Sequence, residues 1–415
     1  MLRTLRPVTS LLAGTALLLA AVGLLNTLIP LRGIEAGYSG TLLGALTSAY
    51  YAGYLIGTFT MPPLIRRIGH IRAFAFCTAC AACVVLLHAL GTWPWMWLTL
   101  RLLAGVVLVG LYAIIESWLN AQAPAGQRGT VFAAYMVVNL GSLALAQQLL
   151  RIDGQPFVLF IVVALFTCAA TLPVVMTRQE QPAQQTTPRL HLARLFHLAP
   201  TAGVGALLSG LAMGAFWGLA PVYAQRVGFD TDGISVYMTL AILGGAALQW
   251  PLGRWSDRTD RRLALAVTGA AATVLALLVW VVGGHPIAAT VLIFVYGGMA
   301  FAIYPIVVAH LVDHLTPTEL LAASGTVLLV YGAGSAVGPL VSGVLMTHMG
   351  PDALPLWFAL MHAVLAGYAL WRYLAFRREQ VVENNFRPML RTSPAALKMM
   401  PETRDAAPDP QHADS

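Results

Sequence analysis

The chain has 415 residues, of which 58% are hydrophobic and 10% are charged, and its formal net charge is +7. Soluble domains carry about 25% charged residues, so this composition excludes an ordinary soluble protein. A basic excess can indicate nucleic-acid binding, but here the arginines lie where membrane topology requires them, and we expect no nucleic-acid partner.

Twelve apolar segments follow one another along the chain. A hydrocarbon core about 30 Å thick requires about 20 residues of helix. We therefore predict an all-α membrane protein with spanning helices at residues 8–29, 40–62, 73–90, 95–115, 130–150, 156–176, 201–222, 234–252, 263–283, 287–309, 325–346 and 356–376.

Basic residues alternate between the breaks that separate these segments. The odd-numbered breaks carry only Arg32, Arg151 and Arg226, whereas the chain ends and the even-numbered breaks carry most of the other arginines. Cytoplasmic loops are enriched in Lys and Arg. We therefore expect a multi-pass protein of a bacterial-type inner (plasma) membrane, with both termini in the cytoplasm.

The chain divides into two halves with six segments each. Residues 1–176 form the first half, 177–200 a cytoplasmic linker rich in Gln, Pro and Thr, and 201–376 the second half. Residues 377–415 mix charge, proline and short polar side chains, and we expect a disordered cytoplasmic tail.

The two halves also resemble each other in sequence. The run Gly129-Thr130-Val131 opens the fifth segment, with Tyr135 following, and the run at 325–327 opens the eleventh, with Tyr331 following. Two six-helix halves related as parallel repeats are typical of one class of transporter. The repeat therefore predicts two pseudo-symmetric six-helix bundles.

The run GRWSDRTDRR at residues 253–262 resembles the G-x-x-x-D-R-x-G-R-R loop of the major facilitator superfamily, with Asp260 in place of the second glycine. The first-half copy, residues 66–72, keeps Gly69 and Arg72 but lacks the aspartate. RLLAG at residues 101–105 looks like the family's R-x-x-x-G element, and ESWLN at 116–120 is similar to the YcaD-like branch. The resemblance covers residues 1–376 and implies the twelve-helix transporter fold of that family.

These loops suggest a conformational latch. An Asp257 carboxylate that closes the eighth segment can lie near the amino end of the fifth, where free N–H groups and the helix dipole favour an anion by about 0.3–1 kcal/mol. The expected ion pairs join Arg258, Arg261 and Arg262 to Asp313, and Arg66, Arg67 and Arg72 to Glu116. The alternative is that these arginines only enforce the topology.

Arg101 is the one basic residue inside a predicted segment away from Arg372 and the chain ends. An ionisable group in the membrane is a functional hypothesis by default. Arg101 either faces a central cavity, where it would attract anionic or polar groups, or snorkels to the nearby interface.

No carboxylate lies in the middle of a predicted segment. Proton-coupled transporters usually carry an acidic or histidine relay within their spans. Glu35, Glu116 and His310, all near segment ends, are the candidates, and the coupling ion stays open.

In the resembled family the first, fourth, seventh and tenth segments line the pathway. This analogy selects Asn26, Arg101, Tyr112, Phe216, Trp217, Tyr296 and Tyr304, with Asn139 and Gln249 as secondary candidates for binding or coupling. Their mixture of aromatic, amide and cationic groups suits an amphipathic or moderately polar organic solute.

We therefore expect a monomeric secondary active transporter of small organic solutes, with the lipid bilayer as its environment and protons as the candidate coupling ion. A facilitative uniporter and a transporter-like sensor or scaffold without flux are the alternatives. The chain has no H-E-x-x-H, G-x-S-x-G or phosphate-binding loop motif, so we expect no enzyme activity, metal or cofactor.

Overall fold

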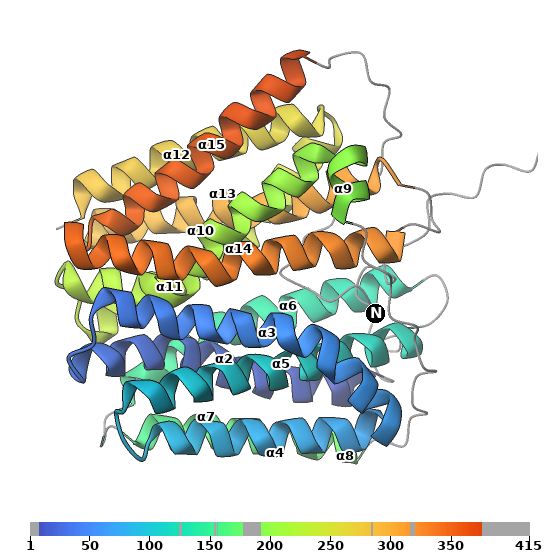
Figure 1. Ribbon diagram of the computed structural model, residues 1–415, viewed down its shortest axis with the longest axis vertical. Coiled ribbons are helices and arrows are strands. Elements are labelled where there is room, and N and C mark those ends of the chain that lie inside the picture. Colours follow the sequence, from blue (N-terminus) through green and yellow to red (C-terminus); the bar gives the residue numbers. More distant parts are fainter. Residues whose placement is uncertain are drawn as a thin grey trace, which may run out of the picture.

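The protein is described by a computed structural model covering residues 8–123, 127–152, 155, 157–176, 192–283, 285–315 and 320–375, with the backbone alone for 320–322. The predicted tail and residues 177–191 of the predicted linker lie outside the described residues. The described chain is a bundle of long helices (Figure 1).

The first half contains α2 (Thr9–Glu35), α3 (Gly40–Ile68), α4 (His70–His88), α5 (Pro94–Gln122), α6 (Arg128–Gln148), the short η2 (Leu149–Arg151), α7 (Val158–Ala169) and α8 (Thr171–Val175). The short helix α9 (Leu192–Leu198) lies within the predicted linker. The second half contains α10 (Pro200–Arg226), α11 (Thr231–Asp257), α12 (Arg261–Val282), α13 (Pro286–Val312), α14 (Leu320–Met349) and α15 (Ala353–Ala375).

The predicted twelve-span fold is confirmed. Eleven helices of the described chain are long and apolar enough to cross a membrane, with α7 and α8 together forming one of them. The twelfth is α3, which has 29 residues and packs between α5 and α14. Its Thr and Tyr side chains lower its hydropathy, and several of them face protein rather than lipid.

Two predicted spans end several residues before their helices do, because the prediction followed hydropathy alone. Helix α3 continues past Pro62 and Pro63 to Ile68, and α5 continues past residue 115 to Gln122. The last turns of α5 carry polar side chains, but Glu116 is fully buried. A polar residue in a spanning helix can face the protein interior, so the fall in hydropathy after residue 115 did not mark the end of the helix.

The sixth span is broken rather than continuous. Helix α7 ends at Ala169 and α8 begins at Thr171, two residues before Pro173. A proline ring clashes with the carbonyl four residues earlier and lacks an N–H donor. Pro173 therefore accounts for the break at this position.

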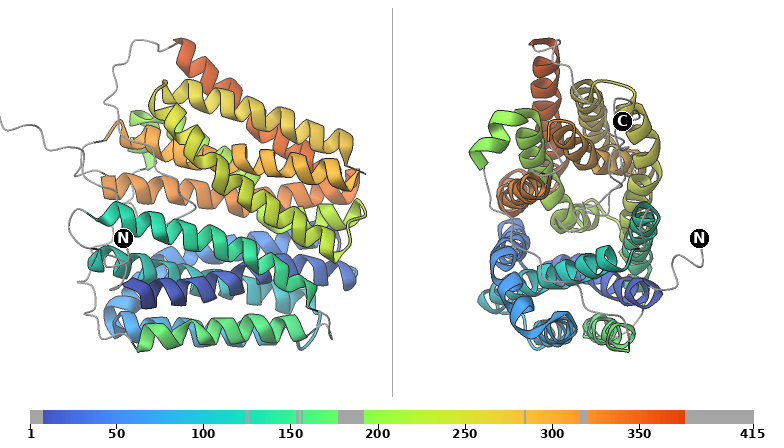
Figure 2. Two further views of the ribbon diagram at one scale, coloured as in Figure 1. Left: turned by 180° about the vertical axis from the view of Figure 1, so that it is seen from behind. Right: turned by 90° about the vertical axis from the view of Figure 1, so that its right-hand side faces the viewer.

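Glycine contacts hold equivalent helices together in the two halves. A Cβ atom on Gly53 or Gly105 would lie 1.9 Å from a carbonyl oxygen of the facing helix, so α3 and α5 touch backbone to backbone. About 190 residues later, Gly244 and Gly297 make the same contact between α11 and α13. Small residues permit such close approach in membranes, and the two groups of helices are visible end-on in Figure 2.

The two copies of the loop motif turn in different ways. Gly69 alone joins α3 to α4 with φ +84°, a conformation that favours glycine. Asp260 has an ordinary φ of −55°, and its Oδ1 accepts a hydrogen bond from the Arg262 amide at 2.8 Å, which caps α12. The longer second turn therefore needs no glycine where the motif has one. We call the end of the bundle that carries these two turns the basic end.

The two halves are joined at the opposite end of the bundle, where α3 begins and α14 ends. A Cβ atom on Gly44 would lie 2.2 Å from the Pro339 carbonyl oxygen. The hydroxyls of Thr41 and Thr347 lie 3.0 Å apart, and Thr347 Oγ1 also accepts from the Thr41 amide at 2.8 Å. Backbone contact and hydrogen bonds therefore hold α3 against α14.

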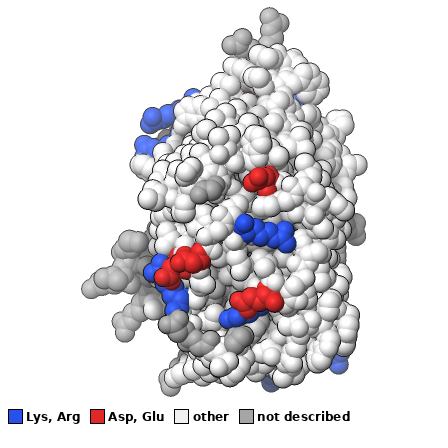
Figure 3. Space-filling view, turned by 90° about the vertical axis from the view of Figure 1, so that its left-hand side faces the viewer, with Lys and Arg blue, Asp and Glu red and all other residues white. Residues whose placement is uncertain are grey.

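A second contact between the halves joins α6 to α11 at the same end. Ser235 Oγ donates to the Gln147 carbonyl at 2.8 Å, and Gln148 Nε2 donates to Thr239 Oγ1 at 2.7 Å. An exposed ion pair at 3.3 Å joins Arg151 to the first turn of α11. Figure 3 looks onto this opposite end, where acidic and basic side chains lie close together on a largely uncharged surface.

Candidate functional site

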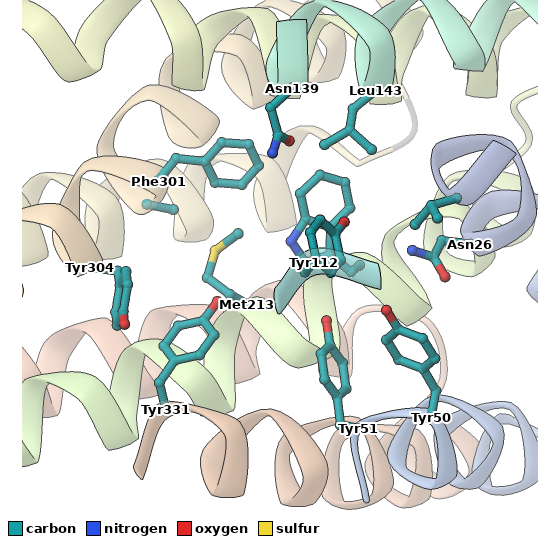
Figure 4. Close-up of a pocket in the computed structure, with 13 residues that line it drawn as sticks. Asn26, Tyr50, Tyr51, Tyr112, Asn139, Leu143, Met213, Phe301, Tyr304 and Tyr331 are labelled. Carbon is teal, nitrogen blue, oxygen red and sulfur yellow. The ribbon is translucent and has the colours of Figure 1, made fainter. Parts of the chain in front are cut away.

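A pocket lies between the two halves, and helices of both halves line it (Figure 4). Tyr50 of α3, one of its lining residues, is ten residues from the start of that helix, or about 15 Å along its axis. That distance is about half of a 30 Å hydrocarbon core. The lining residues are Val22, Asn26, Tyr50, Tyr51, Tyr112, Asn139, Leu143, Met213, Trp217, Ala300, Phe301, Tyr304 and Tyr331.

Several predicted binding candidates line this pocket together. They are Asn26 of α2, Tyr112 of α5, Asn139 of α6, Trp217 of α10 and Tyr304 of α13. The family analogy selected the first, fourth, seventh and tenth spans, and the pocket also uses α3, α6 and α14. Their role in binding a solute stays a prediction.

The sequence analysis missed the tyrosines of α3 and α14. Tyr50, Tyr51 and Tyr331 line the pocket but lie on spans outside the analogy. Consecutive phenols in an apolar span were a usable signal, because a buried tyrosine hydroxyl needs a polar partner. The repeat partner of Tyr331 is Tyr135, which instead donates its hydroxyl hydrogen to Glu116.

Aromatic side chains form one wall of the pocket. The rings of Trp217 and Phe301 are stacked with centroids 5.6 Å apart and an interplanar angle of 21°. Tyr304 and Tyr331 pack with centroids 4.5 Å apart. Phe216, a further candidate, is fully buried behind this wall and meets Trp217 edge-on. The wall can hold the apolar body of a solute.

Arg101 neither lines the central pocket nor reaches the surface. Its position therefore differs both from the expected side chain facing the cavity and from the expected side chain snorkelling to the interface. Its side chain is only 4% exposed. The guanidinium carbon lies 4.5 Å from the centre of the Tyr50 ring, and Nη2 donates to Asn26 Oδ1 at 3.3 Å. Arg101 therefore lies directly behind two lining residues.

The remaining binding candidates lie away from the central pocket. Tyr296 lines a smaller pocket inside the second half, together with Tyr223, Tyr237 and Phe358. Gln249 is buried and donates to the Phe301 carbonyl at 3.4 Å. Gln249 therefore contacts the aromatic wall through the backbone carbonyl of Phe301.

Glu116 is a buried carboxylate inside α5 rather than a residue after its end. It has no exposed surface and accepts a hydrogen bond from Tyr135 Oη at 2.9 Å. Tyr112, one helical turn earlier on α5, lines the central pocket. The predicted partners Arg66, Arg67 and Arg72 are exposed at the turn between α3 and α4, and their pairing with Glu116 stays a prediction.

Arg261 joins three helices of the second half at the basic end. Its Nε donates to Asp313 at 2.7 Å and its Nη1 to Asp257 at 2.8 Å, from the ends of α13 and α11. The expected ion pair between Arg261 and Asp313 is therefore present. A latch role for Asp257 against α6 stays a prediction, and Arg258 is exposed at the C-cap of α11.

Arg262 pairs with the residue that caps its own helix. Its Nη2 lies 2.9 Å from Asp260 Oδ2, and its Nε lies 3.1 Å from Oδ1. Burial alone would raise the pKa of Asp260, but the hydrogen bonds and charge of Arg262 outweigh burial and lower it. The cap is therefore ionised, and it loses this stabilisation only as the pH falls through that lowered pKa.

The chemistry of the central pocket is that of a binding site. Its thirteen lining residues supply phenols, amides, thioether and apolar groups, and none of them is a carboxylate or a cation. In the described part of the chain no three His, Cys, Asp or Glu side chains are close enough to hold a metal ion. The pocket can therefore bind a solute through aromatic contacts and hydrogen bonds.

Two helical halves with a pocket between them, halfway along the spanning helices, are typical of one class of membrane transporters. The sequence profile described as Major Facilitator Superfamily matches residues 11–200 and 202–401. The chain belongs to this family, whose members carry small molecules across a lipid bilayer.

Relatives with similar sequences are named as transporters of the same family. An uncharacterized MFS-type transporter of Enterobacter sp. (strain 638) is 33% identical over 84% of this chain and 91% of its own length. The YcaD protein of Salmonella arizonae, also named an uncharacterized MFS-type transporter, is 31% identical over 85% and 92%. Because these relatives are bacterial multi-pass transporters, the protein belongs in an inner membrane.

Solved structures share the fold. A crystal structure of the nucleoside transporter NupG has a TM-score of 0.73 and 16% identity, covering 88% of this chain and 99% of NupG. A bacterial homologue of the human lysosomal transporter Spinster, inward-facing and unoccupied, has a TM-score of 0.69 and 13% identity, covering 89% and 96%. At such identities the likeness establishes the fold alone.

Proposed function

We propose that this protein is a secondary active transporter that carries small organic solutes by alternating access and couples their movement to protons. The observation that carries the proposal is the pocket at mid-membrane between halves that are joined at the opposite end. Breaking those contacts while closing the basic end would transfer access from one side of the membrane to the other.

The basic end faces the cytoplasm in this proposal, as do both termini. The exposed arginines of the turns after α3 and α11 support that orientation, because cytoplasmic loops are enriched in basic residues. With this orientation, the contacts between α3 and α14 and between α6 and α11 close the periplasmic side. Asp257, held by Arg261, would serve as a latch against the start of α6 when the cytoplasmic side closes.

Glu116 is the proposed proton acceptor. It is a fully buried carboxylate in a spanning helix, its partner Tyr135 is also buried, and Tyr112 on the next turn lines the pocket. The other candidates are less suited, since Glu35 pairs with Arg32 near the opposite end and His310 lies beside His314 at the basic end. A facilitative uniporter is the second candidate function, because no carboxylate lines the pocket itself.

A disulfide between α3 and α14 is expected to trap the pocket on one side. The native cysteines (Cys77, Cys80, Cys83 and Cys168) are free and would first be replaced by serine. Oxidation of a Thr41→Cys/Thr347→Cys pair then fixes the two helices where their hydroxyls now lie 3.0 Å apart. A Tyr331→Cys reporter in the pocket should react with a membrane-impermeant maleimide from the basic end only.

The measurement uses membrane vesicles of both orientations, before and after reduction. Reduction of the disulfide should restore labelling from both sides, and each single threonine variant should behave like the reduced pair. A locked protein that is labelled from both sides, or a reduced protein that is labelled from one side only, would contradict alternating access.

Glu116→Gln is expected to separate transport from proton coupling. The amide keeps the shape of the side chain and accepts a hydrogen bond from Tyr135, but it does not titrate. An imposed pH gradient should no longer drive accumulation in proteoliposomes, while exchange of solute across the membrane continues. Accumulation at the wild-type level in this variant would show that Glu116 is not the coupling acid, whereas a wild-type protein that no pH gradient drives to accumulate solute would favour the uniporter.

A further inference from the structure

The charge of Arg101 has no counter-ion among the described residues. None of the ion pairs there includes Arg101. Its Nε and Nη1 are buried and, within the described residues, have no hydrogen-bond partner. Burying a charge without a partner is costly, and such groups in membranes are usually functional. Among the described residues, Arg101 is therefore an uncompensated cation one layer behind the pocket.

Arg101 fixes the orientation of an amide that lines the pocket. A guanidinium only donates hydrogen bonds, so the atom of Asn26 that faces Arg101 Nη2 must be its oxygen. The two N–H donors of Asn26 then point elsewhere. Figure 4 shows the nitrogen on the side of Asn26 that faces Tyr112, with the oxygen turned away. The buried Arg101 cation therefore holds the Asn26 amide in place and polarises it, and the N–H donors of that amide face the pocket.

The rest of the pocket is apolar and aromatic. The stacked rings of Trp217 and Phe301, with Met213 beside them in the lining, offer surface to a flat or branched apolar body. The Asn26 amide and the Tyr50 ring that covers Arg101 form the polar pole. A solute that satisfies both regions has a negative acceptor group at one end and an apolar body at the other.

We propose that the solute carried by this protein is a small amphipathic organic anion, bound with its carboxylate or similar group at Asn26 and its apolar body against Trp217 and Phe301. This inference rests on the proposed transport function. Arg101 is a positioning residue here: it orients Asn26 and supplies the positive field, whose effect is strong because the surroundings have a low dielectric.

The test compares matched acids and neutral amides. The probes are phenylacetate with phenylacetamide, and indole-3-acetate with indole-3-acetamide, which differ mainly in charge. Binding is measured by thermal stabilisation of the purified full-length protein, since a ligand of the folded state raises its stability by mass action. Each acid should bind about tenfold or more tightly than its amide, as expected when one partner of a hydrogen bond carries a charge.

Variants separate charge recognition from a merely structural role. Arg101→Gln should remove the preference for the acid while leaving amide binding within a few-fold, and Arg101→Lys should restore much of the preference. Asn26→Asp places a negative group at the polar pole and should weaken binding of the acids more than that of the amides. A structural role for Arg101 would lower binding of acid and amide equally.

Three results would overturn the proposal: acid and amide that bind equally to the wild-type protein, a preference that survives in Arg101→Gln, or folded protein that none of the four probes stabilises. Uptake of the same probes into proteoliposomes tests the transport function separately. Amides that cross while acids do not would leave transport intact and reject the anion. Acids that bind without crossing would support the anion site and contradict transport.

Discussion

Gly105→Ala is expected to destabilise the protein by about 1–3 kcal/mol or more, as overpacking of a tightly packed site does. The new Cβ would lie 1.9 Å from the Tyr50 carbonyl oxygen and 2.7 Å from the Tyr54 amide nitrogen. Both are backbone atoms, so α3 and α5 must separate. That movement would also draw Arg101 away from Tyr50. Thermal unfolding of the detergent-purified protein, followed by size-exclusion chromatography, measures the loss.

Gly141→Ala on α6 is the matched control. A Cβ at Gly141 would meet nothing within 4 Å, and alanine stabilises a helix by about 0.5–1 kcal/mol relative to glycine. Gly297→Ala, which contacts the Ala241 carbonyl at 2.2 Å, should behave like Gly105→Ala in the other half. If the Gly105 and Gly141 variants unfold at the same temperature, α3 and α5 are not in the backbone contact described.

Arg261→Met should be the most destabilising single change at the basic end, costing about 3–5 kcal/mol as typical for one partner lost from a buried ion pair. The side chains of Arg261 and Asp313 are 7% and 3% exposed. Methionine fills a similar space but leaves the Asp313 carboxylate buried after its guanidinium partner is removed. The second half should unfold earlier, which limited proteolysis and thermal melting of purified protein detect.

Two further variants identify the cause. Arg258→Met removes an exposed arginine of the same loop and should change stability little. Arg261→Met combined with Asp313→Leu removes both charges and should recover much of the loss. A double variant that is as unstable as the sum of the two single variants would show that the pair does not couple.

The fold could be predicted from the sequence because a bilayer restricts spanning segments to a narrow range of length and composition. The prediction was wrong where residues of a spanning helix are surrounded by other helices rather than by lipid. Glu116 lies inside α5 although hydropathy placed it beyond the fourth span, because its neighbours are other helices. Pro62 and Pro63 likewise lie inside α3 rather than at its end.

The candidate site could be predicted only in part. Asn26 and Trp217 were selected by analogy with the spans that line the pathway in the family, and Asn139 because an amide in hydrocarbon needs a partner. All three line the pocket. The place of Arg101 behind Asn26 and Tyr50 depends on how α2, α3 and α5 cross, and the spacing of residues along one helix does not determine that crossing. Tyr331 shows the same limit, since its repeat partner Tyr135 is directed at Glu116 instead.

Arg101, a buried cation with no counter-ion among the described residues, is also expected to make transport sensitive to voltage. A potential of 100 mV does about 2.3 kcal/mol of work on one elementary charge that crosses the whole membrane. Arg101 lies in the membrane interior, and a change of access from one side to the other changes the fraction of that potential that it experiences. In the proposed cycle Glu116 also lies in the membrane interior, so the electrical work on the empty carrier depends on the charges of both residues, and protonation of Glu116 or binding of an anion changes that work.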